Sequence, residues 1–297
     1  MALPSNKQLQ YLCALSEHRH FGRAAEACFV SQSALSTGIN ELERNLGVTL
    51  FERGSTILLT EVGRQLVSQA QEVLNQLSNF VEHAQQSQGE FQSDLRFGVI
   101  PTIAPFLLPK ILKLMQQKYQ SNKLFIREDL SPNLLDKLSK GELDVLLFAL
   151  PYDVSDFESH ELFEDELVLC LPPNHCLLDK AKISIPDLKK QDILLLEDGH
   201  CLRDQSLKSC NLDAKDLSIP YQATSLATLV QMVVNNVGVT LLPKMAVTAN
   251  ITHDTEAEIR SIDTNRNVSR TIALVWRKNS PRENEFKQLG KLISAFA

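Results

Sequence analysis

No proline interrupts the chain between Ser5 and Glu90, and this sets the first ninety residues apart from the rest. Proline breaks helices because its ring removes a backbone N–H donor and clashes with the preceding turn. A proline-free stretch of this length, with apolar residues at helical spacing, is typical of an all-helical region. We therefore expect a helical N-terminal part followed by a part of different architecture.

Three short helices and a small wing are predicted before residue 60. Apolar positions within 9–15 give the first helix a buried face, and residues 21–29 supply a second helix. The third begins at Ser31, whose hydroxyl can cap free N–H groups, and ends at Gly47. A tight turn between the second and third helices makes a helix-turn-helix. Residues 50–59 have the pattern of a two-stranded wing.

Residues 61–90 are predicted to form one long helix. Its apolar positions recur at steps of three and four, close to the 3.5-residue repeat of a coiled-coil seam. They are Val62, Leu66, Ala70, Val73, Leu77, Phe80 and Ala84. One interpretation is a helix packed on its own domain. Because a small domain offers little core for so long a helix, we favour a role in dimerisation.

From residue 95 onward, apolar runs of strand length alternate with helical patterns. Strands are expected at 95–100, 124–126, 145–149, 167–171, 193–196, 238–242 and 271–276, with helices at 101–119 and 132–139. Such alternation predicts an α/β fold with mainly parallel sheets. Helix N-termini that follow strands, as at Thr102 and Ser225, lie at the sheet edge where small ligands bind.

Composition excludes several classes of protein. No apolar run approaches the roughly eighteen residues of a membrane span, and the N-terminus lacks the apolar segment of a signal peptide, so we expect a cytoplasmic protein. The net charge of −6 argues against indiscriminate nucleic-acid binding. Six cysteines in a reducing compartment are expected to be free or redox-active, and none shows C-x-x-C zinc spacing. No cofactor and no metal are expected.

One short run suggests thiol chemistry. Cys201 lies between His200 and Arg203, and Cys210 follows nine residues later. A thiol near cationic groups loses its proton more readily, and the thiolate attacks oxidants. The alternative is that both cysteines fill a core, since cysteine is among the most buried residue types.

Several N-terminal motifs together resemble the winged helix-turn-helix of LysR-type transcriptional regulators. They are residues 21–27 (FGRAAEA), 30–36 (VSQSALS), Leu42-Glu43, Leu46-Gly47 and 50–53 (LFER). The resemblance implies a DNA-binding domain at 1–60, a linker or dimerisation helix at 61–90 and a regulatory domain at 91–297. That domain would have two Rossmann-like lobes of the periplasmic-binding-protein type. Lobe I would span about 91–165 plus 268–297, and lobe II about 166–267.

The same resemblance implies the residues that read DNA. Polar side chains of the third helix would lie at the major groove, and Arg53 on the wing would reach the minor groove or backbone. The helix residues are Ser31, Gln32, Ser33, Ser36 and Thr37. Proline is common in the family at the position of Ser33. Residues 1–90 carry six basic residues against nine glutamates, so affinity must come from positioned contacts and two-fold symmetry.

The run at 196–205 (LEDGHCLRDQ), with Cys210 behind it and residues 223–226 (ATSL) further on, is similar to hydrogen-peroxide-sensing members of that family. This implies Cys201 as the peroxidatic cysteine and Cys210 as the resolving one. Four further residues would surround the thiol: Thr102, Ser131, His200 and Arg270. Asp204 could orient the leaving oxygen or a water. Threonine is common where this chain has Ser131, and we expect function to survive that change.

The spacing of the two cysteines then predicts a conformational change. If the intervening segment is helical, the nine positions from one cysteine to the other span about 13 Å along the axis. A disulfide needs Cα atoms within about 7 Å. Closing the bond must therefore unwind the segment.

The predicted function is a peroxide-responsive transcription activator of antioxidant genes, and not an enzyme. The expected partners are promoter DNA, hydrogen peroxide, RNA polymerase, a thiol reductant such as glutaredoxin or thioredoxin, and other copies of the chain. The copies would form a dimer through the linker helix and a homotetramer. Two alternatives stay open: a LysR-type regulator of a small organic ligand, and a thiol peroxidase. An extracytoplasmic solute-binding protein is disfavoured by the missing signal peptide.

Overall fold

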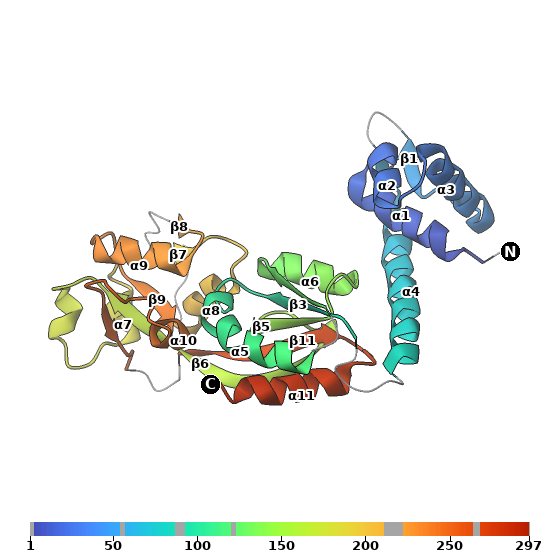
Figure 1. The fold of residues 1–297 in the computed structure, drawn as a ribbon. Helices are drawn as coiled ribbons and strands as arrows, with labels where there is room; N and C mark the ends of the chain where they lie inside the picture. The colour runs from blue at the N-terminus through green and yellow to red at the C-terminus, as the bar shows by residue number, and fades with distance from the viewer. Residues whose placement is uncertain are drawn as a thin grey trace. The chain divides into compact units, whose positions relative to one another are not determined.

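The computed structural model describes residues 3–53, 57–86, 93–119, 123–210, 222–263 and 268–296. It forms two compact units, Met1–Gln85 and Gln86–Ala297. Figure 1 gives the element labels used below.

The N-terminal unit begins with three helices, α1 (Asn6–His18), α2 (Phe21–Ala27) and α3 (Gln32–Leu46). Their ends follow from local chemistry. Ser5 and Gln8 form a capping box on α1, the Ser31 hydroxyl accepts from the Ala34 N–H at 3.2 Å, and Gly47 closes α3 with a left-handed φ of 71°. The predicted helix-turn-helix is confirmed.

The wing and the long helix complete this unit. Strands β1 (Phe51–Arg53) and β2 (Ile57–Leu59) pair antiparallel. Helix α4 (Glu61–Gln86) begins after Thr60, whose hydroxyl accepts from the Gly63 N–H at 2.9 Å. A side chain at Gly63 would clash with the Leu50 carbonyl, so the first turn of α4 packs directly against the wing.

The second unit is organised around a seven-stranded sheet in the order β10-β6-β11-β5-β3-β4, with β9 also paired to β6. The strands are β3 (Leu95–Val99), β4 (Leu124–Glu128), β5 (Val145–Leu150), β6 (Phe157–Leu171), β9 (Thr240–Pro243), β10 (Glu258–Arg260) and β11 (Ser269–Arg277). A small separate sheet joins β7 (Leu195–Leu196) to β8 (Gln222–Ala223).

The prediction of mainly parallel sheets is wrong for the described strands. β3 pairs parallel with β4 and β5, but β11 pairs antiparallel with both β5 and β6, and β6 pairs antiparallel with β9 and β10. The cause is the length of β6, which pairs with β11 in its first part and with β9 and β10 from Leu167 onward. The chain thus crosses between two lobes on antiparallel strands.

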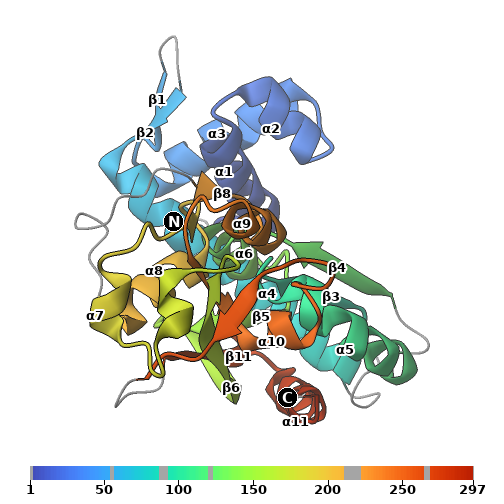
Figure 2. The same ribbon diagram turned by 90° about the vertical axis from the view of Figure 1, so that its left-hand side faces the viewer.

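Helices cover both lobes. They are α5 (Ala104–Lys118), α6 (Ser131–Ser139), α7 (Ile185–Leu188), α8 (Cys201–Ser209), α9 (Leu226–Val234), α10 (Lys244–Thr248), α11 (Glu283–Ser294) and the 3₁₀ helix η1 (Cys176–Asp179). Figures 1 and 2 show α6 on one face of the sheet and α11 on the other. Among the residues that the structure describes, no helix is both long and apolar enough to cross a membrane.

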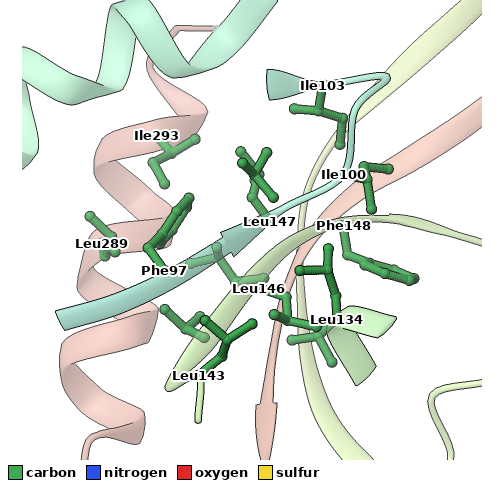
Figure 3. Close-up of a cluster of buried hydrophobic side chains, with 14 of the residues drawn as sticks. Phe97, Ile100, Ile103, Leu134, Leu143, Leu146, Leu147, Phe148, Leu289 and Ile293 are labelled. Carbon is green, nitrogen blue, oxygen red and sulfur yellow. The ribbon is translucent and has the colours of Figure 1, made fainter. Parts of the chain in front are cut away.

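Each lobe has its own hydrophobic core. In the first lobe, Phe97 and Leu147 face Leu289 and Ile293 of α11, while Leu146 lies toward Leu134 of α6 (Figure 3). A second cluster gathers the inner residues of β9, α9 and the end of β6. The two clusters matter for function because the two candidate redox cysteines belong to different ones.

Candidate redox site and DNA-recognition helix

Cys201 is the first residue of α8 and is 2% exposed. The chain turns sharply from β7 into this helix at Gly199, whose φ of +95° suits glycine. A Cβ at Gly199 would also lie 3.1 Å from a methyl of Leu130. Glycine at this turn therefore lets the chain pass close to Leu130, at the start of α6, and so allows the Cys201 side chain to be buried.

The residues that the resemblance assigned to the thiol's surroundings are all buried: Thr102, Ser131, His200 and Arg270. Arg270 donates from Nη1 to the Thr102 hydroxyl at 2.8 Å and from Nη2 to the Thr102 carbonyl at 3.1 Å. Thr102 does not begin α5, which starts at Ala104 without a side-chain cap. Its hydroxyl serves the arginine instead, and Arg270 is a buried residue rather than part of a surface ion pair.

Three buried polar atoms near this point have no hydrogen-bond partner in the described part of the chain: Ser131 Oγ, His200 Nδ1 and Gln205 Oε1. The Ser131 hydroxyl lies close enough to Cys201 to favour its thiolate, although their contact falls short of regular hydrogen-bond geometry. A buried polar group without a partner costs about 1–3 kcal/mol. Of the three, the Ser131 hydroxyl is the one that acts on the Cys201 thiol and is available to a small polar molecule there.

The cation acting on Cys201 is Arg270, not its sequence neighbour. Burial raises the pKa of Cys201, while Arg270, Ser131 and backbone N–H groups at the start of α8 lower it. Arg203 instead donates to the Leu196 carbonyl and pairs with Asp198. Burial also lowers the pKa of His200, which favours its neutral form. The expectation that a flanking cation activates the thiol is therefore corrected.

Cys210 caps the C-terminal end of α8 and is fully buried. It belongs to the core of the second lobe, whereas Cys201 belongs to the core of the first. Both thiols are free. Cys210 is nine positions along the helix from Cys201, an axial rise of about 13 Å, which is beyond the roughly 7 Å that a disulfide allows.

The buried thiols predict a loss of stability at alkaline pH. Burial raises the pKa of Cys210 to about 11 and that of Cys170 to about 12. Because the unfolded thiols titrate near about 8.5, the unfolded state loses these protons first as pH rises. The free energy of unfolding should fall by up to about 1.4 kcal/mol per pH unit for each thiol above that pH.

Denaturant titrations between pH 7.5 and 10 measure this loss. Cys176→Ser, which changes an exposed thiol, is the control. Its free energy of unfolding should fall with pH as steeply as that of the unaltered chain. A free energy of unfolding that does not change over this range would contradict the raised pKa values of Cys170 and Cys210.

Sequence reasoning missed two buried residues of this site. Asp165 pairs with Arg270 at 3.0 Å, and Gln205 donates from Nε2 to the Ala149 carbonyl at 2.9 Å. Asp165 lies between two acidic neighbours, Glu164 and Glu166, in a run that is typical of a solvated surface. Strand alternation was the available signal, since only the middle carboxylate of the three is buried. Asp204, in contrast, is exposed.

A cleft of about 200 Å³ opens between the lobes beside this site. Thr102, His200, Ser225 and Leu226 are among the residues that line it. The Ser225 hydroxyl is engaged in capping α9 through the Thr228 N–H at 3.2 Å. Within the described ranges, no group of three or more His, Cys, Asp or Glu side chains could hold a metal ion.

In the N-terminal unit, α3 presents polar side chains at its start. Ser31, Gln32, Ser33 and Thr37 are exposed, and Ser36 is half-buried. The opposite face of the helix enters the core through Leu35, Ile39 and Leu42. Arg53 ends β1, and its side chain lies outside the described part of the structure.

Helix α4 divides its apolar residues between two faces. Ala70 is buried and Leu66 packs partly against the helix-turn-helix core. Four of the predicted dimer residues are exposed: Val62, Val73, Leu77 and Phe80, of which Phe80 is 73% exposed. Apart from Val62 in its first turn, these exposed apolar residues lie in the half of the helix distal to the wing.

Both parts of the chain match known protein families. Residues 6–64 match the family described as "Bacterial regulatory helix-turn-helix protein, lysR family", and residues 88–296 match "LysR substrate binding domain". The chain belongs to the LysR family. Its regulatory domain has the two-lobed, periplasmic-binding-protein-like form, and the predicted fold class is confirmed.

Within the LysR family, the chain is similar to proteins named OxyR. It is 38% identical over 290 residues to the "DNA-binding transcriptional dual regulator OxyR" of Escherichia coli K12, covering 97% of this chain and 94% of the relative. Full-length OxyR of Pseudomonas aeruginosa, as a cysteine-to-aspartate variant, matches with a TM-score of 0.77 and 35% identity over 99% of this chain and 95% of that one.

A third match concerns a structure of OxyR from Corynebacterium glutamicum, a cysteine-to-serine variant with hydrogen peroxide bound. It has a TM-score of 0.66 and 30% identity, covering 99% of this chain and 92% of that one.

Proposed function

We propose that this chain is a peroxide-responsive DNA-binding regulator in which Cys201 is the peroxidatic cysteine and Cys210 the resolving one. The observation that carries the proposal is the position of the two thiols. They lie at opposite ends of one helix and in the cores of different lobes. The names of the relatives support peroxide as the signal.

The chemistry has two steps. The Cys201 thiolate attacks one peroxide oxygen, the O–O bond breaks, and the departing hydroxide takes a proton to leave as water, so that Cys201 becomes a sulfenic acid. The Cys210 thiol then attacks the sulfenic sulfur, and a second water leaves as the disulfide forms. Two thiols are oxidised by two electrons in total, and one peroxide is reduced to two waters.

Specific groups suit the first step. The hydroxyls of Thr102 and Ser131 are available to orient the peroxide, and the Arg270 charge favours both the thiolate and the departing hydroxide. The neutral His200 ring supplies an unpartnered Nδ1. The role predicted for Asp204 requires the site to open, because that side chain faces solvent.

The second step is the switch. Bringing Cys210 to Cys201 requires α8 to unwind and Cys210 to leave the core of the second lobe. A helix that has two alternative arrangements is the kind of two-state element that converts local oxidation into a change of subunit contacts. The DNA-binding units of the oligomer would then move apart or together on the promoter.

The wider role follows from the LysR family membership. We propose a cytoplasmic homotetramer that activates antioxidant genes through RNA polymerase and is reset by a dithiol reductant of the glutaredoxin or thioredoxin type. The helix-turn-helix argues against a thiol peroxidase, which would have no use for it. An organic ligand in the cleft at the start of α9 is also disfavoured, because its volume of about 200 Å³ is smaller than the ~300–1,000 Å³ of ordinary ligand pockets.

The exposed apolar face of α4 predicts dimerisation through this helix. Replacing Leu77 and Phe80 together with glutamate should weaken the dimer by about a hundredfold, because two buried apolar side chains are lost per chain. Sedimentation velocity of the full chain should show the smaller species at micromolar concentration. Gln76→Glu, an exposed change one residue away, is the control, and unchanged sedimentation of the double variant would remove α4 from the interface.

The proposed function is tested by footprinting. A binding site is first selected from random DNA with the untreated full chain, and its protection from DNase is then compared before and after stoichiometric peroxide. We expect the protected length to change and to return after reduction with dithiothreitol. A footprint that peroxide leaves unaltered would refute the proposed function.

A further inference from the structure

Asp165 and Arg270 form a buried ion pair behind the candidate redox site. They are directly opposite each other on β6 and β11. Arg270 Nε lies 3.0 Å from Asp165 Oδ2, and the two side chains are 0% and 3% exposed. A buried ion pair persists only where its remaining hydrogen-bonding groups are also satisfied, because desolvation of the two charges is costly.

Further hydrogen bonds stabilise both partners of the pair. The guanidinium donates to the Thr102 hydroxyl and carbonyl, at 2.8 and 3.1 Å. The second carboxylate oxygen, Oδ1, accepts from the Met245 N–H at 3.0 Å, in the first turn of α10. Asp165 thus joins the arginine of the redox site to a helix beside the strand that crosses between the lobes.

We propose that Asp165 is a positioning residue for Cys201: its carboxylate fixes Arg270 beside Thr102 and balances part of the charge that the guanidinium offers to the thiolate. This inference rests on the proposed oxidation of Cys201. Asp165 itself touches neither the thiol nor, in this arrangement, the peroxide site, since Arg270 and Thr102 lie between them in the chain of hydrogen bonds.

The carboxylate and the thiolate compete for one cation. The charged and titratable groups that act around Cys201 are Arg270, the neutral His200 ring, and Tyr152, which is itself influenced by Asp204. Arg270 is the cation among them that favours the thiolate. The negative charge of Asp165 offsets part of the positive charge of Arg270. The pKa of Cys201 is therefore higher with Asp165 in place than it would be without it.

Asp165→Asn tests this directly, because it removes the charge and keeps the shape. Asp165→Asn, every variant compared with it and the parent protein would all carry Cys210→Ser, so that oxidation stops at the sulfenic acid. The rate of Cys201 oxidation by peroxide is followed between pH 5.5 and 9 by quenching and peptide mass spectrometry. We expect the inflection of the profile to move to lower pH in Asp165→Asn.

The expected change in rate can be bounded. A thiol pKa lower by one unit gives about ten times more thiolate but a nucleophile weaker by about threefold, so the rate at pH 6.5 should rise about threefold. Asp165→Glu restores the charge while altering the packing, and it should return the inflection toward that of the parent. A merely structural role would move both variants alike.

Asp144→Asn is the matched control. Asp144 is equally buried and pairs with Arg96 and Arg282, away from the thiol, so its loss should lower stability and leave the profile in place. An inflection in Asp165→Asn that stays in place or moves to higher pH, or equal movement in Asp144→Asn, would overturn the inference.

If Asp165→Asn does not fold, Arg270→Gln is compared with the double variant Asp165→Asn/Arg270→Gln, which removes both charges together. Equal profiles are expected, because Asp165 acts through Arg270, and a large difference between them would overturn the inference. If the parent shows no oxidation of Cys201 at all, the proposed function fails instead.

Discussion

Replacing Cys201 with serine is expected to abolish the peroxide-dependent change in the DNA footprint. Serine is close to cysteine in size, so the untreated protein should fold and bind DNA as before. Its hydroxyl does not ionise near neutral pH and cannot reduce the peroxide bond. The variant should show no sulfenic acid, no disulfide to Cys210 and no shift in DNase protection after peroxide.

The control for this change is Cys176→Ser, which removes an exposed thiol in η1. That variant should respond to peroxide as the unaltered chain does. A normal footprint change in Cys201→Ser would exclude this thiol as the sensor and would direct attention to the remaining cysteines.

Replacing Cys210 with serine should separate the two chemical steps. Cys201 would still be oxidised, but its sulfenic acid would persist because the resolving thiol is absent. Labelling with dimedone and mass spectrometry should find the adduct on Cys201 in nearly every molecule after one equivalent of peroxide. The unaltered chain should show almost none, because the disulfide forms instead.

The same variant also tests the coupling of the disulfide to structure. In the unaltered chain, oxidation should strip protection from the amides of α8, since about 13 Å of helix cannot remain while the thiols are bonded. Cys210→Ser should keep α8 protected after peroxide, as measured by hydrogen exchange. Equal protection in the oxidised unaltered chain would contradict the switch.

The local elements were predictable from sequence because local chemistry determines them. Ser31 and Gly47 bound α3 through a cap and a left-handed residue, and both positions are visible as residue types. The composition of the segment between Cys201 and Cys210 only allowed a helix, and the structure shows that the segment forms α8.

The sheet direction and the charges of the site were not predictable in this way. The antiparallel connection between the lobes depends on the pairing of the long strand β6 with β11. These strands are far apart in sequence, so no local pattern predicts their pairing. Arg203 is the nearest cation to Cys201 in sequence, yet Arg270 is the one that opposes the rise in its pKa, because β11 brings Arg270 to Thr102 and α8 directs Arg203 to the Leu196 carbonyl. Tertiary pairing, not sequence proximity, decides the electrostatics.

Mass spectrometry of the full chain after one equivalent of hydrogen peroxide tests the central claim most directly. Digestion without reduction should yield one dominant linked species, joining the peptide of Cys201 to that of Cys210, and dithiothreitol should remove it. Oxidised protein in which this link is absent, with both thiols unmodified or with Cys201 paired elsewhere, would contradict the account.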